Sequence, residues 1–467
     1  MYQSPAPENR IANRSSGGFR QCSHAAIDMP YPSQLESSAH FAAVPLSHFS
    51  NKPTGGNEVK SPFLRFGVIG ILALISTWFP ASTANAATRQ NDHAIVLVHG
   101  FMGWGRDELL GYKYWGGLFD LQQYLTDSGY PTYTVAVGPF SSNWDRACEM
   151  YAYLKGGRVD YGEAHSRAHG HARYGRTLPG IYRDWGTLDS MGRLRKAHFI
   201  AHSQGGQTSR VLLELLRSGS AAERAAASAA GQAVHPLFAG GKNWVRSITS
   251  IATPHDGTTL AEGGEMIPLI RQFVGAMAVA AGATGTSDVY DFKLEHWGLQ
   301  RRSGERLDDY LSRMFNHPLW QTRDISAYDL KPEGAAALNG WVKAKSDVYY
   351  FSWETEATYN LFGIEAPEIT MLAPLQPGAW FMGAYTRSGI DSSWFKNDGV
   401  VNTRSMKGPT LNSNDPIIDY SGTAQPGRWQ KMGLKSSWDH ADIIGHTLWP
   451  ISGYYRDMAA LLGSLPR

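Results

Sequence analysis

Ser203 stands in a sequence that can turn its hydroxyl into a nucleophile. It lies in Ala201-His-Ser-Gln-Gly205, between the apolar run 197–201 and a stretch whose leucines recur at helical spacing. A strand that turns sharply into a helix exposes a serine and needs small flanking residues, because the two backbones pass close together. The first N–H groups of such a helix also favour negative charge. The sequence therefore predicts a nucleophile elbow rather than a buried serine in an ordinary turn.

A serine hydroxyl needs a histidine as base and a carboxylate that fixes the tautomer of that histidine. Around a strand-to-helix elbow the usual chain order is Ser, Asp, His. Asp398, in a turn ahead of apolar residues, and His440, on a loop before the last predicted helix, satisfy this order with Ser203. Chain order leaves three rivals open, which are His446 for the base and Asp439 and Asp442 for the acid.

A glycine-rich loop follows the nearly continuous apolar run 94–99, whose pattern is that of a strand buried on both faces. The loop reads His99-Gly-Phe-Met-Gly-Trp-Gly105. In a fold with a nucleophile elbow, such a loop supplies one backbone N–H of the oxyanion hole, and the residue after the nucleophile supplies the other. This rule assigns the backbone amides of Phe101 and Gln204 as the two donors of the oxyanion hole. A glycine-rich turn without a role is the alternative.

Histidines and a carboxylate gather in the stretch 141–179. It contains Asp145, His165, His169 and His171 among many Gly, Tyr and Arg residues. Because the stretch shows little helical or strand periodicity, we expect a long irregular insertion that needs something to hold it. Imidazole nitrogens and carboxylate oxygens can bind zinc tetrahedrally. Spacing by itself favours ordinary surface histidines over a metal site.

The elements that position these residues alternate between strands and helices. Five runs have strand character: 94–99, 132–137, 197–201, 244–253 and 348–353. Strands and helices that alternate over this length predict a doubly wound α/β fold with a mostly parallel central sheet and helices on both faces. The length of 467 residues and the 42% share of hydrophobic residues suit one large core, and no repeat or second domain is evident.

Charge and cysteine content exclude several classes of protein. The net charge of +2 gives no electrostatic reason to bind nucleic acid or an acidic membrane surface. Of the two cysteines, Cys22 lies in a segment that we expect to be absent from the mature protein. A disulfide framework is therefore excluded, and Cys148 is expected to be a lone thiol. Nothing in the sequence implies an obligate protein partner.

The stretch 265–281 is amphipathic, rich in methionine and apolar residues, and flanked by glycines. It is either a core helix or a lid that hides the site in water and opens on lipid, with the glycines as hinges.

Residues 60–86 read as a signal peptide. Basic residues precede the apolar run 66–79, and Ala84-Asn-Ala86 is a small-residue cleavage signal. The run is too short for a comfortable membrane span, which disfavours the alternative of an uncleaved anchor. Residues 1–59 are expected to be a disordered extension without function, with true translation starting near Val59. Residues 87–467 would then form the mature, exported domain.

Several motifs, taken together, carry a resemblance to a known family. The blocks are 99–105, 114–117, 142–148, 201–206, 252–259, 289–294, 397–399 and 439–440. In this order they resemble the thermoalkalophilic secreted lipases of the thermophilic bacilli, over essentially all of 87–467. The resemblance implies an α/β-hydrolase fold with a helical lid and a secreted, extracellular enzyme. It also implies triacylglycerol hydrolysis at an oil–water interface by an acyl-enzyme mechanism.

The resemblance further implies a role for each site residue. Ser203 becomes the nucleophile, Asp398 the acid and His440 the base, with Phe101 and Gln204 as oxyanion donors. The same machinery would suit a broader carboxylesterase or polyester hydrolase. Two other classes stay open, a hydrolase whose zinc-bound water reacts and a non-catalytic binding protein that keeps the fold.

The resemblance also implies two metal sites. The family's structural zinc would be held by Asp145, His165, His171 and Asp291, which leaves His169 unliganded. It would brace the insertion beside the lid, and four protein ligands would leave no open position for chemistry. A calcium ion would use the carbonyl of Gly334 and Asp442. The family has a glutamate in place of Asp442 and an Asp-Pro pair in place of Thr447-Leu448, so only a weak site is expected.

Overall fold

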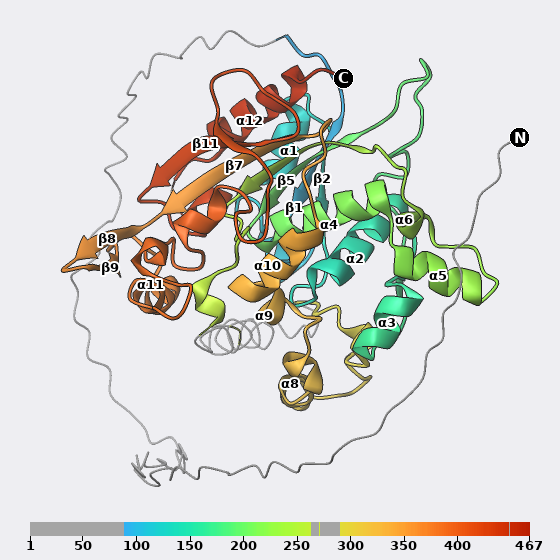
Figure 1. The fold of residues 1–467 in the computed structure, drawn as a ribbon, viewed down its shortest axis with the longest axis horizontal. Coiled ribbons are helices and arrows are strands. Elements are labelled where there is room, and N and C mark those ends of the chain that lie inside the picture. The colour runs from blue at the N-terminus through green and yellow to red at the C-terminus, as the bar shows by residue number, and fades with distance from the viewer. Residues whose placement is uncertain (1–87, 263–269, 271–289, 448) are drawn as a thin grey trace, which may run out of the picture. The chain divides into compact units, whose positions relative to one another are not determined.

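A parallel sheet of seven strands runs through the part of the chain that the structure describes (Figure 1). In the computed structural model, this part comprises residues 88–262, 270, 290–447 and 449–467. The chain divides into units 1–79 and 80–467, and every described residue belongs to the second unit. The predicted extension 1–59, the predicted signal peptide 60–86 and all but one residue of the stretch 265–281 lie outside the described residues.

The strand order of the sheet is β10-β11-β7-β6-β5-β1-β2, and all neighbouring pairs are parallel. The strands are β1 Ala94–Val98, β2 Thr132–Val135, β5 Ala197–His202, β6 Val245–Ile251, β7 Tyr349–Glu356, β10 Ile417–Asp419 and β11 Trp429–Ser436. All five predicted strands are therefore present. Two antiparallel pairs lie outside the sheet: β3 Gly157–Asp160 with β4 Tyr174–Leu178, and β8 Thr358–Leu361 with β9 Ile364–Pro367.

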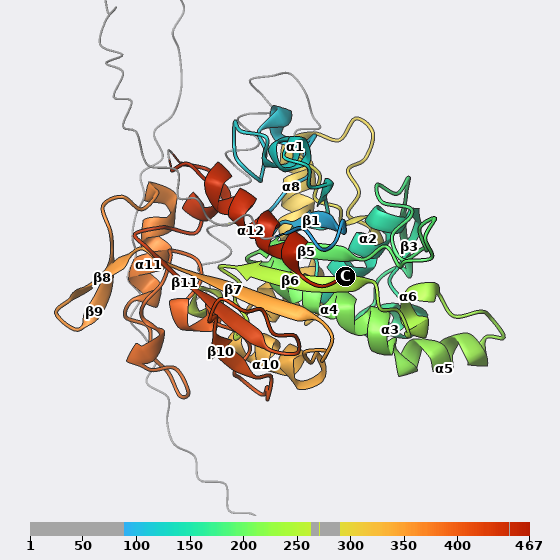
Figure 2. The same ribbon diagram turned by 90° about the horizontal axis from the view of Figure 1, so that it is seen from above.

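Helices cover both faces of the sheet. Figure 2 shows α1 Leu121–Asp127 and α12 Ser452–Ser464 on one side, and α4 Gln204–Ser218 and α10 Pro332–Trp341 on the other. Side chains of a strand point alternately to the two faces. Ile95 and Leu97 of β1 accordingly join the core beneath α1 and α12, whereas Val96 and Val98 join the core against α4. Burial on both faces explains why the central strands are continuous apolar runs.

The insertion 141–179 is not the irregular segment that we expected. It contains α2 Asn143–Lys155, β3, α3 Glu163–His169 and β4. Helix α2 packs against α4 and buries most of its thirteen residues, including charged ones. A helix that is buried almost all round has no polar stripe, so its sequence shows no amphipathic period.

The remaining helices connect these layers. They are α5 Ala221–Ala229, α6 Pro236–Ala239, α8 Leu307–Phe315, α9 Ser326–Asp329 and α11 Gln376–Met382. None of the helices within the described residues is long and apolar enough to cross a membrane.

Two ends of the domain are joined by hydrogen bonds. The side-chain amide of Asn91 donates to the carbonyl oxygens of Leu462 and Leu465 at 2.8 and 2.9 Å. The backbone amide of Gln90 donates to the carbonyl of Gly463 at 2.8 Å. The chain just before β1 is thus held by the chain at the end of α12.

Candidate active site

Ser203 lies between β5 and α4, where the backbone turns from strand to helix. Its φ of 56° and ψ of −134° place a non-glycine residue in the left-handed region, a strain of about 1–3 kcal/mol. The flanking residues must be small because the elbow is crowded. A Cβ on Gly205 would collide with the carbonyl of Val98, and one on Gly100 would collide with Ser203 itself. The predicted elbow is therefore present, and Gly100 lies against the serine.

His440 and Asp398 are hydrogen-bonded at the carboxyl end of the sheet. Nδ1 of His440, on the loop after β11, lies 2.7 Å from Oδ2 of Asp398. Asp398 is fully buried, and its Oδ2 also accepts from the hydroxyl of Thr355 in β7 at 2.7 Å. Its Oδ1 accepts from the backbone amide of Val401 at 2.8 Å. These donors orient the carboxylate, and the imidazole keeps Nε2 for another partner.

The three rival residues have other partners. Nε2 of His446 donates to the carbonyl of Tyr114 at 2.9 Å, and burial lowers the pKa of this histidine. The carboxylates of Asp439 and Asp442 accept hydrogen bonds from backbone amides, as structural turn residues do. Of the three candidate acids, Asp398 is the one whose carboxylate contacts the ring of His440. The ring of His440 also lies 4.4 Å, centroid to centroid, from the ring of His202, the residue just before Ser203.

The two amides that we assigned to an oxyanion hole have no hydrogen-bond acceptor within the described part of the chain. Among the described residues, neither the N–H of Phe101 nor that of Gln204 donates a hydrogen bond to another protein group. Gln204 is the first residue of α4, so its amide is one of the free donors at a helix start. Such free donors beside a nucleophile can bind an oxyanion.

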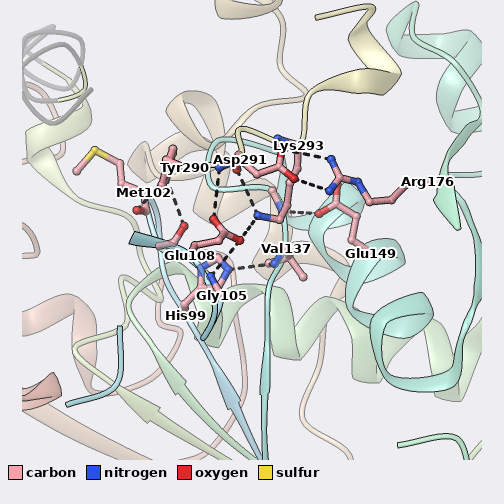
Figure 3. Close-up of polar contacts among 12 residues, drawn as sticks. His99, Met102, Gly105, Glu108, Val137, Glu149, Arg176, Tyr290, Asp291 and Lys293 are labelled. Atoms are coloured by element: carbon pink, nitrogen blue, oxygen red, sulfur yellow. Dashed lines mark hydrogen bonds and ion pairs between the residues drawn. The ribbon is translucent and has the colours of Figure 1, made fainter. Parts of the chain in front are cut away.

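His99 and Tyr114 hold the start of the loop 99–105, which we call the oxyanion loop. Nε2 of His99 accepts from the amide of Val137 at 3.0 Å, as Figure 3 shows. Nδ1 therefore carries the proton and donates to the carbonyl of Gly100 at 2.9 Å. Burial lowers the pKa of His99 well below its usual value, so the ring is neutral. The hydroxyl of Tyr114 accepts from the amide of Gly100 at 3.0 Å.

The far end of the oxyanion loop is held by residues from another part of the chain (Figure 3). The hydroxyl of Tyr290 donates to the carbonyl of Met102 at 3.0 Å. Oε1 of Glu108 accepts from the amide of Gly105 at 3.2 Å and from Nζ of Lys293 at 2.7 Å. Sequence reasoning gave no role to Tyr290, Glu108 or Lys293, although Tyr290 and Lys293 belong to the motif block 289–294. The motif does not show that this block lies against the oxyanion loop.

A candidate metal centre lies on the insertion. One ligand atom from each of Asp145, His165, His171 and Asp324 can be chosen so that all lie within 4.8 Å of one another. Nε2 of His165 lies 3.3 Å from Oδ1 of Asp145 and 3.2 Å from Oδ2 of Asp324. Within the described part of the chain, Oδ1 of Asp145 and Nε2 of His171 are buried without a hydrogen-bond partner. Two imidazoles and two carboxylates that converge in this way fit a metal ion.

Asp324 occupies the place that we assigned to Asp291, so that assignment was wrong. The carboxylate of Asp291 is about half exposed and pairs with Nη1 of Arg176 at 2.5 Å (Figure 3). Asp324 reaches the cluster because Ser141 and Ile325 form an isolated antiparallel bridge, which brings the chain before α9 beside the start of α2. A tertiary contact of this kind leaves no spacing signal in the sequence.

Neighbouring residues orient the ligands. Nδ1 of His171 donates to the carbonyl of Ala172 at 2.9 Å, which leaves Nε2 unprotonated for a metal. Nε2 of His296 donates to Oδ2 of Asp145 at 3.1 Å. The ring of Trp144 stacks on His165 with centroids 4.9 Å apart. His169, expected to be unliganded, is outside the group of ligands. Sequence reasoning also missed His296, which touches a ligand without being one.

The possible calcium site finds no support. Gly334 lies inside α10, where backbone carbonyls are used by the helix itself. Oδ2 of Asp442 accepts from the amide of Asp439 at 2.8 Å. Searched over the described residues, the structure gathers metal-binding side chains only in the group on the insertion, and Asp442 is not part of that group.

The comparisons with known proteins agree with this geometry. A family model described as "Lipase-like, C-terminal domain" matches residues 91–459. The lipase of Staphylococcus hyicus is 37% identical over 378 residues, which cover 79% of this chain and 56% of that protein. Lipase 1 of Staphylococcus aureus is 37% identical over 363 residues, which cover 76% of this chain and 51% of that protein. The chain thus spans about half the length of the curated relatives it matches.

Two solved structures share the fold. EstA from Clostridium botulinum matches with a TM-score of 0.75 and 47% identity, covering 82% of this chain and 89% of that chain. Lipase 1 from Pelosinus fermentans matches with a TM-score of 0.73 and 50% identity, covering 80% and 99%. The parallel sheet and these likenesses show an α/β-hydrolase fold. With a family model that matches most of its length, this chain belongs to the bacterial lipase family described as lipase-like, C-terminal domain.

Proposed function

We propose that this protein is a lipase, which hydrolyses the ester bonds of triacylglycerols with Ser203 as its nucleophile. The observation that carries the proposal is the buried hydrogen bond of 2.7 Å between Asp398 and His440. It lies at the same end of the sheet as the strained elbow of Ser203. A nucleophile, a base with its orienting acid and two free amides are the parts that acyl transfer needs.

Each residue has a chemical task in this proposal. Oγ of Ser203 attacks the ester carbonyl while Nε2 of His440 takes the hydroxyl proton. The amides of Phe101 and Gln204 hold the negative oxygen of the tetrahedral intermediate. His440 then gives the proton to the leaving alcohol, and a water molecule, activated by the same imidazole, releases the acyl group. Asp398 orients the ring of His440 and stabilises the imidazolium through its hydrogen bond to Nδ1.

The metal in this proposal is zinc, and its role is structural. Two imidazole nitrogens and two carboxylate oxygens suit zinc, which takes four ligands in structural sites. When bound, the ion would cross-link α2, α3 and the chain before α9 through Asp145, His165, His171 and Asp324. Four protein ligands fill a tetrahedral shell, which disfavours the alternative of a zinc-bound water as nucleophile. This ligand set supports the resemblance to the thermoalkalophilic lipases.

We propose further that residues 87–467 are the exported, extracellular form, with 60–86 as the signal peptide and 1–59 as an extension without function. The stretch 265–281 would be the lid, because its amphipathic pattern gives one apolar face to lipid and one polar face to water. An oil–water interface would then be the site of action. Esters that reach the same open site, including polyesters, would be side substrates.

Hydrolysis of p-nitrophenyl esters of rising chain length tests the proposal. Wild-type protein should turn over these esters and favour long chains, and Ser203→Ala should lose about 10⁶-fold in kcat. A serine-directed organophosphate should abolish the wild-type activity. Ser209→Ala is the matched control, because Ser209 is a buried serine of the same helix whose hydroxyl has no protein partner among the described residues. Activity that survives Ser203→Ala and the organophosphate would point to the zinc alternative.

A further inference from the structure

Arg146 is a fully buried arginine whose side chain ends beneath the oxyanion loop. It lies on α2, next to the metal-binding residue Asp145. Its Nη2 is 2.5 Å from the carbonyl oxygen of His99, and its Nη1 is 2.7 Å from that of Gly138 and 3.4 Å from that of Gly100. Every one of these acceptors is a backbone carbonyl at or beside the candidate oxyanion hole.

The remaining hydrogen-bond partner of the guanidinium is also an uncharged group. Its Nε donates to the hydroxyl of Thr208 in α4 at 2.9 Å. Within the described residues, Arg146 forms no ion pair with a carboxylate. Burial of a charge without a counter-ion costs free energy. The hydrogen bonds to the surrounding carbonyl groups offset only part of that cost. A guanidinium stays charged at neutral pH. A purely structural role could be filled at less cost by an apolar side chain.

The geometry of the peptide bond connects these contacts to the reaction. A trans peptide is planar, so the C=O of Gly100 and the N–H of Phe101 point in opposite directions. The carbonyl of Gly100 is held by Nδ1 of His99 at 2.9 Å and by Arg146 at 3.4 Å. The carbonyl of the preceding peptide, that of His99, is held by Arg146 as well. Fixing these two carbonyls fixes the direction of the free N–H of Phe101.

We propose that Arg146 is a positioning residue of the oxyanion hole, which aims the amide of Phe101 at the site where the negative oxygen forms. The inference rests on the proposed ester hydrolysis. The positive charge of Arg146 also favours binding of the negative oxygen. A cation bound to the carbonyl side of a peptide polarises that peptide and strengthens its N–H as a donor. The residue makes no contact with the substrate and acts through the loop.

The kinetic signature of this role differs from that of a merely structural arginine. An interaction that exists only in the transition state lowers kcat and leaves KM nearly unchanged, whereas general destabilisation lowers the folded fraction. Active-site titration with a fluorescent phosphonate counts the folded, competent molecules. Values of kcat divided by that count therefore isolate the contribution of the loop.

Three variants test the proposal on the full chain with p-nitrophenyl esters. Arg146→Met should lower kcat about 100-fold, as the loss of one oxyanion donor does, and should change KM less than about threefold. Arg146→Lys keeps the charge but not the planar fork, so its kcat should lie between those of Arg146→Met and wild type. Thr208→Val removes the acceptor of Nε, together with the hydrogen bonds that the same hydroxyl donates to Asn143 and to the carbonyl of Gln204. It should lower kcat about tenfold through misplacement of the guanidinium.

An alkyl boronic acid, which forms a tetrahedral adduct with the nucleophile, gives a second readout. Its affinity should fall by the same factor as kcat in each variant, because the adduct uses the same amide. Arg210 provides the matched control. It is also a buried arginine, on α4, and its Nη2 donates to the carbonyl of Val342 at 3.4 Å, away from the oxyanion loop. Arg210→Met should lower the melting temperature but leave kcat per titrated site and boronate affinity near wild type.

Two results would overturn the proposal. One is an unchanged kcat per titrated site in Arg146→Lys and Thr208→Val, the variants best able to fold if Arg146→Met does not. The other is an equal loss of kcat and boronate affinity in Arg210→Met. Failure of the proposed function would look different, because wild-type protein would then show no ester hydrolysis that Ser203→Ala removes.

Discussion

The imidazole of His296 donates a hydrogen bond to the carboxylate of Asp145 across 3.1 Å, and thereby holds one ligand of the candidate metal centre. Such outer partners fix the orientation of a ligand and raise its affinity for the ion. We expect His296→Ala to weaken zinc binding by about 10- to 100-fold, measured by competition with a chromogenic chelator. His169→Ala is the control, since His169 lies beside the cluster without ligating. Equal zinc affinity in His296→Ala and wild type would contradict the prediction.

The correction from Asp291 to Asp324 has its own test. Asp324→Ala should lose the single zinc that purified wild-type protein is expected to carry, because three ligands remain. Asp291→Ala should keep the metal, since its carboxylate pairs with Arg176. Elemental analysis of both proteins after dialysis measures the stoichiometry. Zinc retained in Asp324→Ala and lost in Asp291→Ala would restore the assignment that the structure overturned.

Glu149 should make stability depend on pH. Burial raises the pKa of its carboxyl from 4.5 to about 7 in the folded protein, so the folded state holds a proton that the unfolded state has already lost between these values. Stability should therefore fall as pH rises from about 4.5 to about 7, by roughly 3 kcal/mol at most. Urea unfolding at pH 5 and pH 8 measures the difference.

Glu149→Gln is the variant that isolates this effect. An amide has nearly the shape of the protonated acid and can still accept from the amide of Gly138. The difference in stability between pH 5 and pH 8 should shrink, although Asp329, whose pKa burial also raises to about 7, leaves a residual slope of the same sign. A slope as steep as that of wild type would show that Glu149 titrates normally in the fold.

Cys148 should be inert in the native protein. Its thiol is buried in α2, and burial raises its pKa well above the usual value, so almost no thiolate is present at neutral pH. A thiol reagent should react with about one equivalent per mature chain only after unfolding in guanidinium. Rapid labelling of the native protein would mean that α2 opens locally.

Sequence patterns predicted the sheet because its central strands are buried on both faces. Val96 to Val98 and their neighbours must be apolar whatever surrounds them, so the pattern is visible without a structure. Ser203 was equally visible, since the turn demands small neighbours at fixed positions. Chain order narrowed the acid and base, and the structure then placed Asp398 against His440.

The helices and strands of the insertion 141–179 were not predicted, and the reason is physical. Helix α2 buries charged residues, because Asp145 contacts histidines and Arg146 contacts carbonyl groups in the interior. The polar residues of its sequence therefore do not indicate which face is exposed to solvent. Asp324 and His296 reach Asp145 only through the packed fold. Contacts that depend on tertiary packing, and not on local spacing, produce no periodic pattern in the sequence.

The hydrogen bonds from Gln90 and Asn91 to residues 462–465 have a consequence for biosynthesis. Asn91 and Leu462 are 371 positions apart in the sequence. Translation must therefore pass α12 before the chain ahead of β1 can form these hydrogen bonds. The sheet and the helices between these two segments can begin to pack earlier than this contact.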